Sequence, residues 1–426
     1  MIAGSAESAP ALAGVAPAAR PRDARYDARV RTVPLAVGLL LIVVAHPGRA
    51  LADCEASAHG MRADGSDNSA AFTKTLTECA GQTIHIAHGT YLFNPSGYQR
   101  GFQVPANTRL AGDGARGAQA TVLQIGDGGS FASFLWVRNV SKVAIYGIRF
   151  EGTAYDSGCS RHLDYGYAIT IRSDAGQQQP VEYIDVSDDV FHDFNGGGWV
   201  ALMAADGSPG IGLNGRIVIK NNEFDSDANL RGGCAANSPI GQSVVMVSMH
   251  GSDSSGQGLV ANVEVDSNTF EAGYVKGAIA IWSSTRTISV THNSIRDVGL
   301  HLPPYPGELG RYGITVYNSA HNAAGLHPDS VRITDNAITN PVSCGIYVAS
   351  ARNLQIVRNR ISGQRDRNDA TLPKGAIALN HAENVSALEG NELSDNYIGI
   401  SSVGSALNKG TNRINAAAGG TSEKIR

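Results

Sequence analysis

Apolar residues and asparagines recur along the chain with one fixed spacing. In each copy two apolar residues stand two positions apart, an asparagine follows three positions later, and a third apolar residue follows two positions after that. The copies are marked by Asn222, Asn268, Asn293, Asn336, Asn359 and Asn391, and an earlier copy carries Asp189 in the same place. Each asparagine is expected to be structural. At a bend between strands it tolerates left-handed or bridge conformations, and its amide can hydrogen-bond to the asparagine of the next coil as a ladder.

A second alternating pattern fills the stretches between these copies. Its apolar pairs are Ile169 and Ile171, Val200 and Leu202, Val245 and Val247, Ile279 and Ile281, Ile314 and Val316, Ile346 and Val348, and Ile377 and Leu379. Alternation with a period of two predicts strands that each turn one face inward. The shortest repeat, from Asn336 to Asn359, spans 23 residues, which is room for two or three short strands and their turns. A chain that repeats in this way pairs each strand with its equivalent one coil later. We therefore expect an all-β fold, a single right-handed parallel β-helix over residues 53–410, followed by a polar tail at 411–426.

The first 52 residues have the features of a leader. Basic residues precede an apolar run at 33–45, and Ala50, Leu51 and Ala52 follow it. The run is shorter than the roughly 20 residues that a membrane-spanning helix needs. This pattern predicts a secretory signal peptide that is cleaved between Ala52 and Asp53. We expect an exported protein, periplasmic or extracellular, with no membrane association after cleavage.

The net charge and the cysteines restrict the binding partners, disulfides and metal sites that the chain can have. The formal net charge of −4, from 34 basic and 38 acidic residues, gives no attraction to nucleic acid. Export permits disulfides, and the preferred pairs are Cys54 with Cys79 and Cys159 with Cys234. Cys344 is expected to be a buried small side chain. No cysteine or histidine spacing suggests zinc, so we expect no structural zinc site. Separately, we expect the protein to be a monomer.

The segment RADGSDNSAAFTKTLTECAGQTIHIAHGTYLF resembles the opening motif of the pectin lyase-like superfamily of right-handed β-helix proteins. The resemblance covers about residues 60–405. It implies a turn and helix N-cap at Asp64 to Asp67, a short capping helix that presents Phe72, Leu76 and Cys79 on one face, and then the first coil. The superfamily includes polysaccharide lyases, uronate epimerases, glycoside hydrolases and phage tailspikes, so the resemblance implies a polysaccharide as partner.

Long and short connections alternate between the repeat and the next strand. The long ones are 151–167, 225–243, 296–312 and 362–375, and because they all lead into the same strand position we expect them to wall a groove on one side. The outward residues just past each apolar pair are Arg172, Met203, Ser248, Trp282, Tyr317, Ala349 and Asn380. Trp282 and Tyr317 should lie about 5 Å apart on adjacent coils, where two aromatic planes suit a sugar ring.

Elimination or C5 epimerisation of a uronate needs a base for the C5 proton and a cation for the carboxylate. The candidate catalytic residues are Lys276, Arg311, Tyr312, His250 and His301, and the candidate substrate-binding residues are Trp282, Tyr317, Arg172 and Tyr165. Hydrolysis would need two carboxyl groups, either Asp188 with Asp189 or Asp164 with Glu308. The first hypothesis is thus a lyase or epimerase acting on an acidic polysaccharide. The alternatives are a non-catalytic polysaccharide-binding or adhesive β-helix and a glycoside hydrolase. No cofactor is expected, although acidic residues such as Asp225 and Asp227 would suit Ca²⁺.

Overall fold

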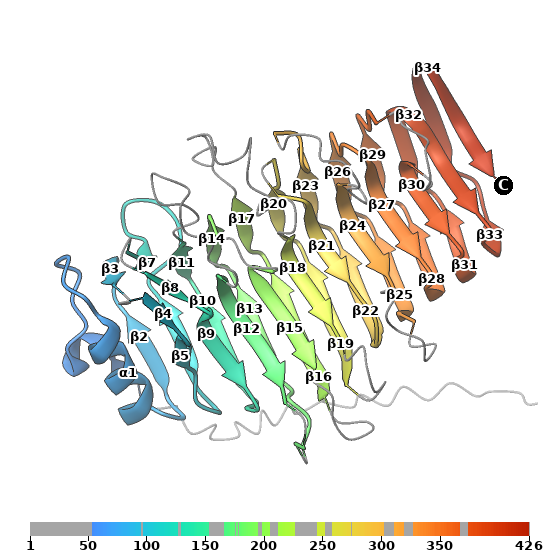
Figure 1. Ribbon diagram of the computed structural model, residues 1–426. Coiled ribbons are helices and arrows are strands. Elements are labelled where there is room, and N and C mark those ends of the chain that lie inside the picture. Colours follow the sequence, from blue (N-terminus) through green and yellow to red (C-terminus); the bar gives the residue numbers. More distant parts are fainter. Residues whose placement is uncertain are drawn as a thin grey trace, which may run out of the picture. The chain divides into compact units, whose positions relative to one another are not determined.

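The computed structural model describes residues 53–94, 97–126, 129–152, 166–174, 176–177, 179–194, 198–204, 212–225, 245–251, 258–273, 275–301, 311–318, 327–366 and 374–425 (Figure 1). Every strand pairing among them is parallel, and each strand pairs with its equivalent in the next coil. The expected all-β, parallel β-helix architecture is therefore confirmed. In this part of the chain no helix is both long and apolar enough to cross a membrane.

Each coil contributes strands to three rows. The first row is a sheet of twelve strands. They are β1 (Asp53–Glu55), β2 (Thr83–Ile86), β6 (Arg109–Gly112), β10 (Val143–Tyr146), β13 (Ile184–Ser187), β16 (Gly212–Lys220), β19 (Leu259–Asp266), β22 (Thr285–Thr291), β25 (Asp329–Thr334), β28 (Arg352–Val357), β31 (Glu383–Glu389) and β33 (Leu407–Lys409).

The second row holds short strands that follow the first row after a tight bend. They are β3 (Gly89–Phe93), β7 (Thr121–Ile125), β11 (Ile148–Glu151), β14 (Val190–His192), β17 (Glu223–Asp225), β20 (Thr269–Glu271), β23 (Ser294–Arg296), β26 (Ala337–Thr339) and β29 (Arg360–Ser362).

The third row lies beyond the long and short connections. Its strands are β5 (Phe102–Gln103), β9 (Ser133–Arg138), β12 (Tyr167–Ser173), β15 (Val200–Ala204), β18 (Val245–His250), β21 (Gly277–Ile281), β24 (Tyr312–Tyr317), β27 (Cys344–Ala349) and β30 (Gly375–Asn380). The strand β32 (Glu392–Val403) pairs with both β29 and β30, and β34 (Arg413–Ile425) pairs with β32. Paired strands therefore continue into 411–426, where the sequence predicted a polar tail. Two further strands, β4 (Gly97–Gln99) and β8 (Gly129–Phe131), pair only with each other.

The interior is built by stacking equivalent side chains. Phe150, Phe191, Phe224 and Phe270 occupy the same position in successive coils, and each is fully buried. Their ring centroids are 5.2, 4.9 and 4.7 Å apart, and the planes lie within 14° of parallel. Burial of each such side chain contributes about 1.5–3 kcal/mol to folding. The spacing of the repeat thus becomes a continuous apolar column.

The helix α1 (Ser69–Glu78) packs on the first coils. Its Phe72 is fully buried, with its ring 5.5 Å from Phe93 and 5.0 Å from Phe102. The N-cap is Asn68, one residue later than the sequence predicted, although the side chain of Asp67 still accepts a hydrogen bond from the Ser69 backbone at 3.1 Å. Figure 1 shows α1 beside β2, at the end of the coil where the described chain begins.

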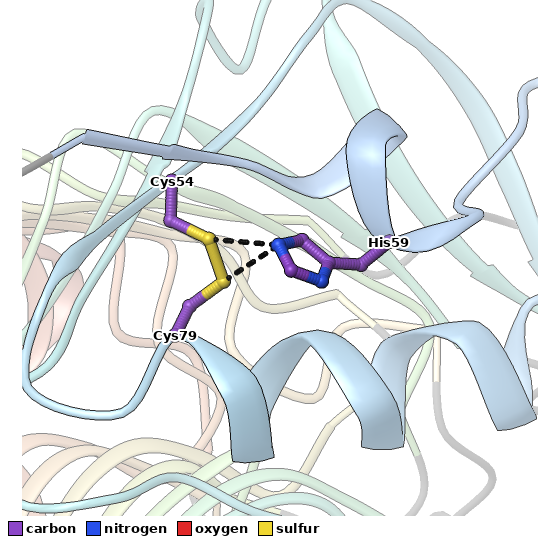
Figure 2. Close-up of side chains that lie close together, drawn as sticks. All are labelled: Cys54, His59 and Cys79. Atoms are coloured by element: carbon purple, nitrogen blue, oxygen red, sulfur yellow. Dashed lines mark hydrogen bonds between the residues drawn. A yellow bond between two sulfur atoms is a disulfide. The ribbon is translucent and has the colours of Figure 1, made fainter.

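Two predictions about cysteines can be followed in the structure. Cys54 and Cys79 form a disulfide, as expected, which joins β1 to the residue after α1 (Figure 2). Cys344 is buried, as expected, and burial raises the pKa of its thiol to about 12. Cys159 and Cys234 lie outside the described residues.

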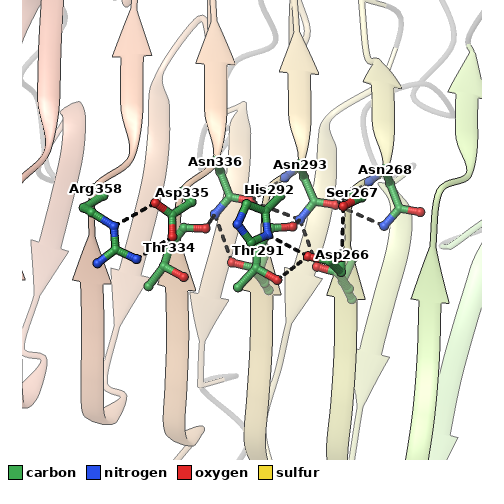
Figure 3. A network of polar contacts seen from close by, with 12 residues as sticks. Asp266, Ser267, Asn268, Thr291, His292, Asn293, Thr334, Asp335, Asn336 and Arg358 are labelled. Atoms are coloured by element: carbon green, nitrogen blue, oxygen red, sulfur yellow. Dashed lines mark hydrogen bonds and ion pairs between the residues drawn. The ribbon is translucent and has the colours of Figure 1, made fainter.

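The asparagine ladder is confirmed at the bend between the first and second rows (Figure 3). The side-chain oxygen of Asn293 accepts hydrogen bonds at 3.0 Å from both the backbone and the side-chain nitrogen of Asn268. Its own side-chain nitrogen donates to the Val265 carbonyl at 2.9 Å and to Asn336 at 3.0 Å. Asn412 extends the ladder by one coil that the sequence pattern did not include.

The left-handed conformation was assigned to the wrong residue. It is adopted by the residue before most ladder positions: Asp188, Asn221, Ser267, His292, Asp335 and Arg358, with φ between 53° and 59°, and Gly390, with φ of 65°. The ladder asparagines themselves do not have a positive φ. The preceding side chains point outward and make their own bonds, such as His292 Nδ1 with Asp266 Oδ1 at 2.9 Å and Arg358 with Asp335 at 2.6 Å (Figure 3).

Candidate functional site

The four long connections each join a second-row strand to the third-row strand that follows it. They come after β11, β17, β23 and β29 and before β12, β18, β24 and β30, as the sequence pattern predicted. The groove that they were expected to wall stays a prediction. Residues 153–165, 226–244, 302–310 and 367–373, and with them Tyr165, Asp164, Glu308 and Asp227, lie outside the described residues.

Outward side chains at the carboxyl ends of the third-row strands form a line across the coils, called here the strand-end row. Strand register aligns Arg138 with Arg172, Arg172 with Met203, and Met203 with His250. The pairing of Ile281 with Val316 brings the next residues, Trp282 and Tyr317, side by side. The row consists of Arg138, Arg172, Met203, His250, Trp282, Tyr317, Ala349 and Asn380.

The register corrects one expectation. Ser248 was assigned to this row, but His250 occupies it, because Val247 and Met249 pair with the interior residues Val200 and Leu202. Val245, Val247 and Met249 are all apolar. The sequence pattern therefore could not show whether the inward pair is Val245 with Val247 or Val247 with Met249. The correction brings a predicted catalytic residue next to a predicted substrate-binding one.

The first part of the strand-end row is cationic. Arg138 and Arg172 both bind the carboxylate of Asp174, the latter with Nε at 2.7 Å from Oδ1, and Asn139 donates to it at 2.8 Å. Burial alone would raise the pKa of Asp174, but these hydrogen bonds hold it below its usual value. The guanidinium side chains are 40% and 37% exposed. Two guanidinium groups share one carboxylate, so this corner keeps a positive charge that faces solvent.

The middle of the row is aromatic. The rings of His250 and Trp282 meet edge to face, with centroids 5.4 Å apart and planes at 85°. Tyr317 packs against a small apolar cluster on the outside of the coil, which contains Tyr312, Cys344, Tyr347, Ala349 and Ala378. Within this cluster the rings of Tyr312 and Tyr347 stack at 4.6 Å. Burial raises the pKa of Tyr347, and its hydroxyl hydrogen-bonds with Asn380 at the far end of the row.

The other candidate catalytic residues lie at the opposite ends of the same strands. Arg311 is buried and donates to the Gly299 carbonyl at 2.7 Å, and the Tyr312 backbone donates to the Lys276 carbonyl at 3.1 Å. His301 is exposed, with its backbone bonded to Gly273. Tyr312 and Tyr317 are the first and last residues of β24, about 17 Å apart at the usual strand rise. The structure therefore places His250 beside Trp282 and Tyr317, and it places Lys276, Arg311 and His301 near the opposite ends of these strands. The backbone of Tyr312 lies at that opposite end too, but its ring stacks on Tyr347 in the cluster against which Tyr317 packs.

The carboxyl pair considered for hydrolysis is a structural feature. Asp189 is fully buried in the ladder, where its Oδ1 accepts the Ile148 backbone N–H at 2.8 Å and its own N–H donates to Asn222 at 3.0 Å. Asp188 is the left-handed residue before it. This geometry supports the turn role that the ladder position indicated.

Three residues of the third-row face were missed by the sequence reasoning. Arg138 and Trp136 belong to β9, and Tyr347 belongs to β27. Trp136 is half-buried and aligns with Thr170, two residues before the position of the strand-end row in each strand. The apolar alternation Phe134–Val137 was available as a signal, but no ladder asparagine marks that coil, so its strand was not registered with the others.

Together these observations define a parallel β-helix with a cationic and aromatic row at the carboxyl ends of its third-row strands. The family model of NosD, a periplasmic copper-binding protein, matches residues 236–422. No curated protein sequence matches the chain.

Several solved structures are similar to this chain. The surface adhesin PfbA of Streptococcus pneumoniae superposes with a TM-score of 0.52 and 10% identity, covering 88% of this chain and 90% of that one. The A-module of the Azotobacter vinelandii mannuronan C-5 epimerase AlgE6 gives 0.49 and 14%, covering 88% and 98%. The endo-xylogalacturonan hydrolase of Aspergillus tubingensis gives 0.49 and 14%, covering 87% and 95%. The likeness to PfbA shows that the resemblance seen in the sequence holds at the level of the fold.

Proposed function

We propose that the chain is an exported protein that binds an acidic, uronate-containing polysaccharide along the strand-end row. The observation that carries this proposal is the alignment of two exposed guanidinium groups with an imidazole, an indole and a phenol, one side chain in each successive coil except at Met203. A linear polymer that follows the coil axis would meet these side chains in turn.

Each part of the row suits one part of such a polymer. Guanidinium groups recognise carboxylates through paired hydrogen bonds, which fits Arg138 and Arg172. The CH face of a sugar ring packs on aromatic planes, which fits Trp282 and Tyr317. Adjacent coils are about 4.8 Å apart, which is comparable to the length of one sugar unit, so successive units could keep the same contacts.

Export is part of the same proposal. The disulfide between Cys54 and Cys79 supports an oxidising compartment, as does the leader pattern in the first 52 residues. The words periplasmic and surface in the names of NosD and PfbA are consistent with it. We also infer that α1 caps the first coil, because its Phe72 packs against Phe93, Phe102 and Phe134 of the first coils.

Binding can be tested by titration of the folded chain with polygalacturonate, alginate and the neutral polymer dextran. We expect binding to the two uronate polymers only, and weaker binding as salt is raised, because the guanidinium contacts are exposed. Trp282→Ala and Arg172→Ala should each weaken binding about tenfold, in line with roughly 1–2 kcal/mol for such contacts.

Two exposed residues away from the row serve as matched controls. Tyr183, which is 54% exposed, precedes β13 of the first row, and Arg286 lies in β22 of the same row. Tyr183→Ala and Arg286→Ala should leave the affinity unchanged. Equal binding of dextran, or equal losses in the controls and the row variants, would contradict the proposal.

A second candidate is abstraction of the C5 proton of the bound uronate, by β-elimination or epimerisation. It is favoured by the position of His250, whose imidazole is held edge-on against Trp282 in the centre of the row. Elimination gives an unsaturated product that absorbs ultraviolet light, and epimerisation in D₂O places deuterium at C5. His250→Ala should then abolish the reaction and keep binding within a few fold. Release of reducing ends without either signal would instead indicate a glycoside hydrolase.

A further inference from the structure

A cluster of potential metal ligands lies at the α1 end of the coil, apart from the strand-end row. It consists of Cys54 in β1, Cys79 directly after α1, and His59 at the end of the short 3₁₀ helix η1 (Ala56–His59). His59 Nε2 is 3.1 Å from the sulfur of Cys54 and 3.3 Å from that of Cys79 (Figure 2). Among the described residues this is the one group of histidine, cysteine and acidic side chains whose donor atoms all lie within 4.8 Å of each other.

The orientation of His59 is that of a ligand. Its Nδ1 lies 2.7 Å from Oε2 of Glu78, the last residue of α1. A carboxylate on Nδ1 fixes the tautomer that carries its proton there, which leaves the Nε2 lone pair directed at the two sulfurs. A disulfide has no hydrogen to offer this lone pair. Two thiols or a thiolate-bound cation would use it.

The surroundings favour a cation. Cys79 follows the carboxyl end of α1, where the helix dipole is negative, and Glu78 adds a carboxylate. Cys79 is fully buried and the His59 side chain is 20% exposed, so the donors are shielded while one edge stays open for entry.

We propose that Cys54, Cys79 and His59 form a redox-gated site for Cu(I). Two thiolates and one imidazole are a soft donor set, and three donors suit Cu(I), whereas Zn²⁺ in structural sites takes four. In the disulfide form the sulfurs are bonded to each other and the site is closed.

A dithiol protein of the thioredoxin class opens it by thiol–disulfide exchange. One reductant thiolate attacks a sulfur of the Cys54–Cys79 bond to form a mixed disulfide, and the second reductant thiol displaces it. Two electrons pass to the cysteines, which take up two protons, and the reductant leaves as its own disulfide. Cu(I) then displaces the thiol protons and binds Nε2 of His59. β1 and α1 are thereby held together in both states, first by the disulfide and then by the metal.

The test uses the full chain with Cys159, Cys234 and Cys344 changed to serine, so that Cys54 and Cys79 are its remaining cysteines. The protein is reduced with dithiothreitol, exchanged into anaerobic buffer and titrated with Cu(I) against bicinchoninate. We expect one Cu(I) per reduced chain and none per oxidised chain. The same titration with Zn²⁺ against a chromophoric zinc chelator should show much weaker binding.

Variants separate ligation from folding. His59→Ala and Glu78→Gln keep the disulfide, so their fold can be checked in the oxidised state by circular dichroism. We expect each to weaken Cu(I) binding, His59→Ala the more strongly and Glu78→Gln by roughly tenfold or more. His85→Ala is the control, because His85 bonds to Glu55 and Asp113 at the same end of the molecule. Equal affinity in His59→Ala, no binding by the folded reduced chain, or tighter binding of Zn²⁺ than of Cu(I) would each overturn the proposal.

Discussion

The two ends of the short second-row strands differ sharply, although only three or four residues separate them. At the start of each strand the same side chain recurs, as the ladder from Asn222 to Asn391. At the end of each strand, next to the loop flank, the side chain changes from coil to coil. These last residues of the second-row strands are distinct from the strand-end row of the third-row strands. They are Glu151, His192, Asp225, Glu271, Arg296, Thr339 and Ser362.

The difference follows from what each position must satisfy. A ladder side chain is buried, and it bonds backbone and amide groups of the neighbouring coils that water cannot reach. Only an amide both donates and accepts in this geometry, so the residue repeats. At the loop end the side chains are partly exposed and pair locally, for example Arg296 with Glu271. That end is free to vary, and variable residues beside loops are where a repeated scaffold acquires function.

The largest effect is expected when the ladder is interrupted. Asn293→Ala removes the acceptor for two nitrogens of Asn268 and the donor to the Val265 carbonyl. Because each buried group left unsatisfied costs about 1–3 kcal/mol, we expect a loss of about 3–5 kcal/mol in the free energy of unfolding. Denaturant unfolding followed by circular dichroism measures it.

The matched substitution lies at the other end of the same strand. Arg296→Ala removes an exposed ion pair with Glu271 and should cost less than about 1 kcal/mol. If the two substitutions destabilise the protein equally, the distinction between the two strand ends is wrong.

A smaller effect of opposite sign is expected at the beginning of the ladder. In later coils the asparagine nitrogen donates to a first-row carbonyl, as Asn222 does to Val186 at 2.9 Å. Asp189 has an oxygen in that place, and its Oδ2 finds no hydrogen-bond partner among the described residues. Asp189→Asn supplies the missing donor and removes the cost of burying a carboxyl group that is ionised in the unfolded chain, so we expect a gain of about 1–3 kcal/mol at neutral pH.

The gain should depend on pH. Burial raises the pKa of Asp189 well above its usual value, against the opposing effect of the hydrogen bond from Ile148. Protonation therefore stabilises the folded wild type, and this stability is lost as pH rises through the raised pKa. The advantage of Asp189→Asn should shrink toward zero below about pH 4, the pKa of an unfolded aspartate. A constant difference between pH 4 and 8 would contradict this account.

The ladder and its partners were predictable from the sequence because their chemistry repeats in every coil. The spacing around Asn293 specified a buried amide, and the alternation specified the strands beside it. The strand-end row was predictable only in part. Around His250 the residues Val245, Met246, Val247 and Met249 are all buried, since both faces of β18 are covered, so alternation could not set the register. Arg138 was missed because its coil has no asparagine to mark it.

Convergence of side chains was the least predictable feature. Arg311 and His250 were grouped as candidates for one groove, yet they belong to opposite ends of the third-row strands. The order of the residues already placed Arg311 before its apolar pair and His250 after its own, but the pattern does not show how far apart the two ends of a strand lie from a shared ligand.

The smallest expected effect concerns charge at the loop end. Glu151 and His192 are neighbours in register, with His192 Nδ1 2.6 Å from Glu151 Oε2. The His192 side chain is 15% exposed and that of Glu151 is 19% exposed. Burial lowers the pKa of His192, but the bond to Glu151 and the negative charges of Glu151, Asp193 and Asp225 together outweigh it, and the pKa is raised. Burial would raise the pKa of Glu151, but the bonds from His192 and Arg149 hold it below its usual value.

These shifts define the pH range in which the pair stabilises the fold. The contribution of His192 is complete below its unfolded pKa of about 6.5 and is lost as pH rises through the raised folded value. That of Glu151 is complete above about 4.5 and is lost as pH falls through its lowered value. Glu151→Gln should therefore cost about 1 kcal/mol near pH 5.5 and clearly less near pH 9. Urea unfolding at the two pH values measures the change, with the exposed Glu264→Gln of β19 as control. Because amides do not titrate, the penalty of Asn293→Ala should be the same at both pH values. A penalty for Glu151→Gln that is equally independent of pH would mean that the loop end, like the ladder, is held by neutral hydrogen bonds.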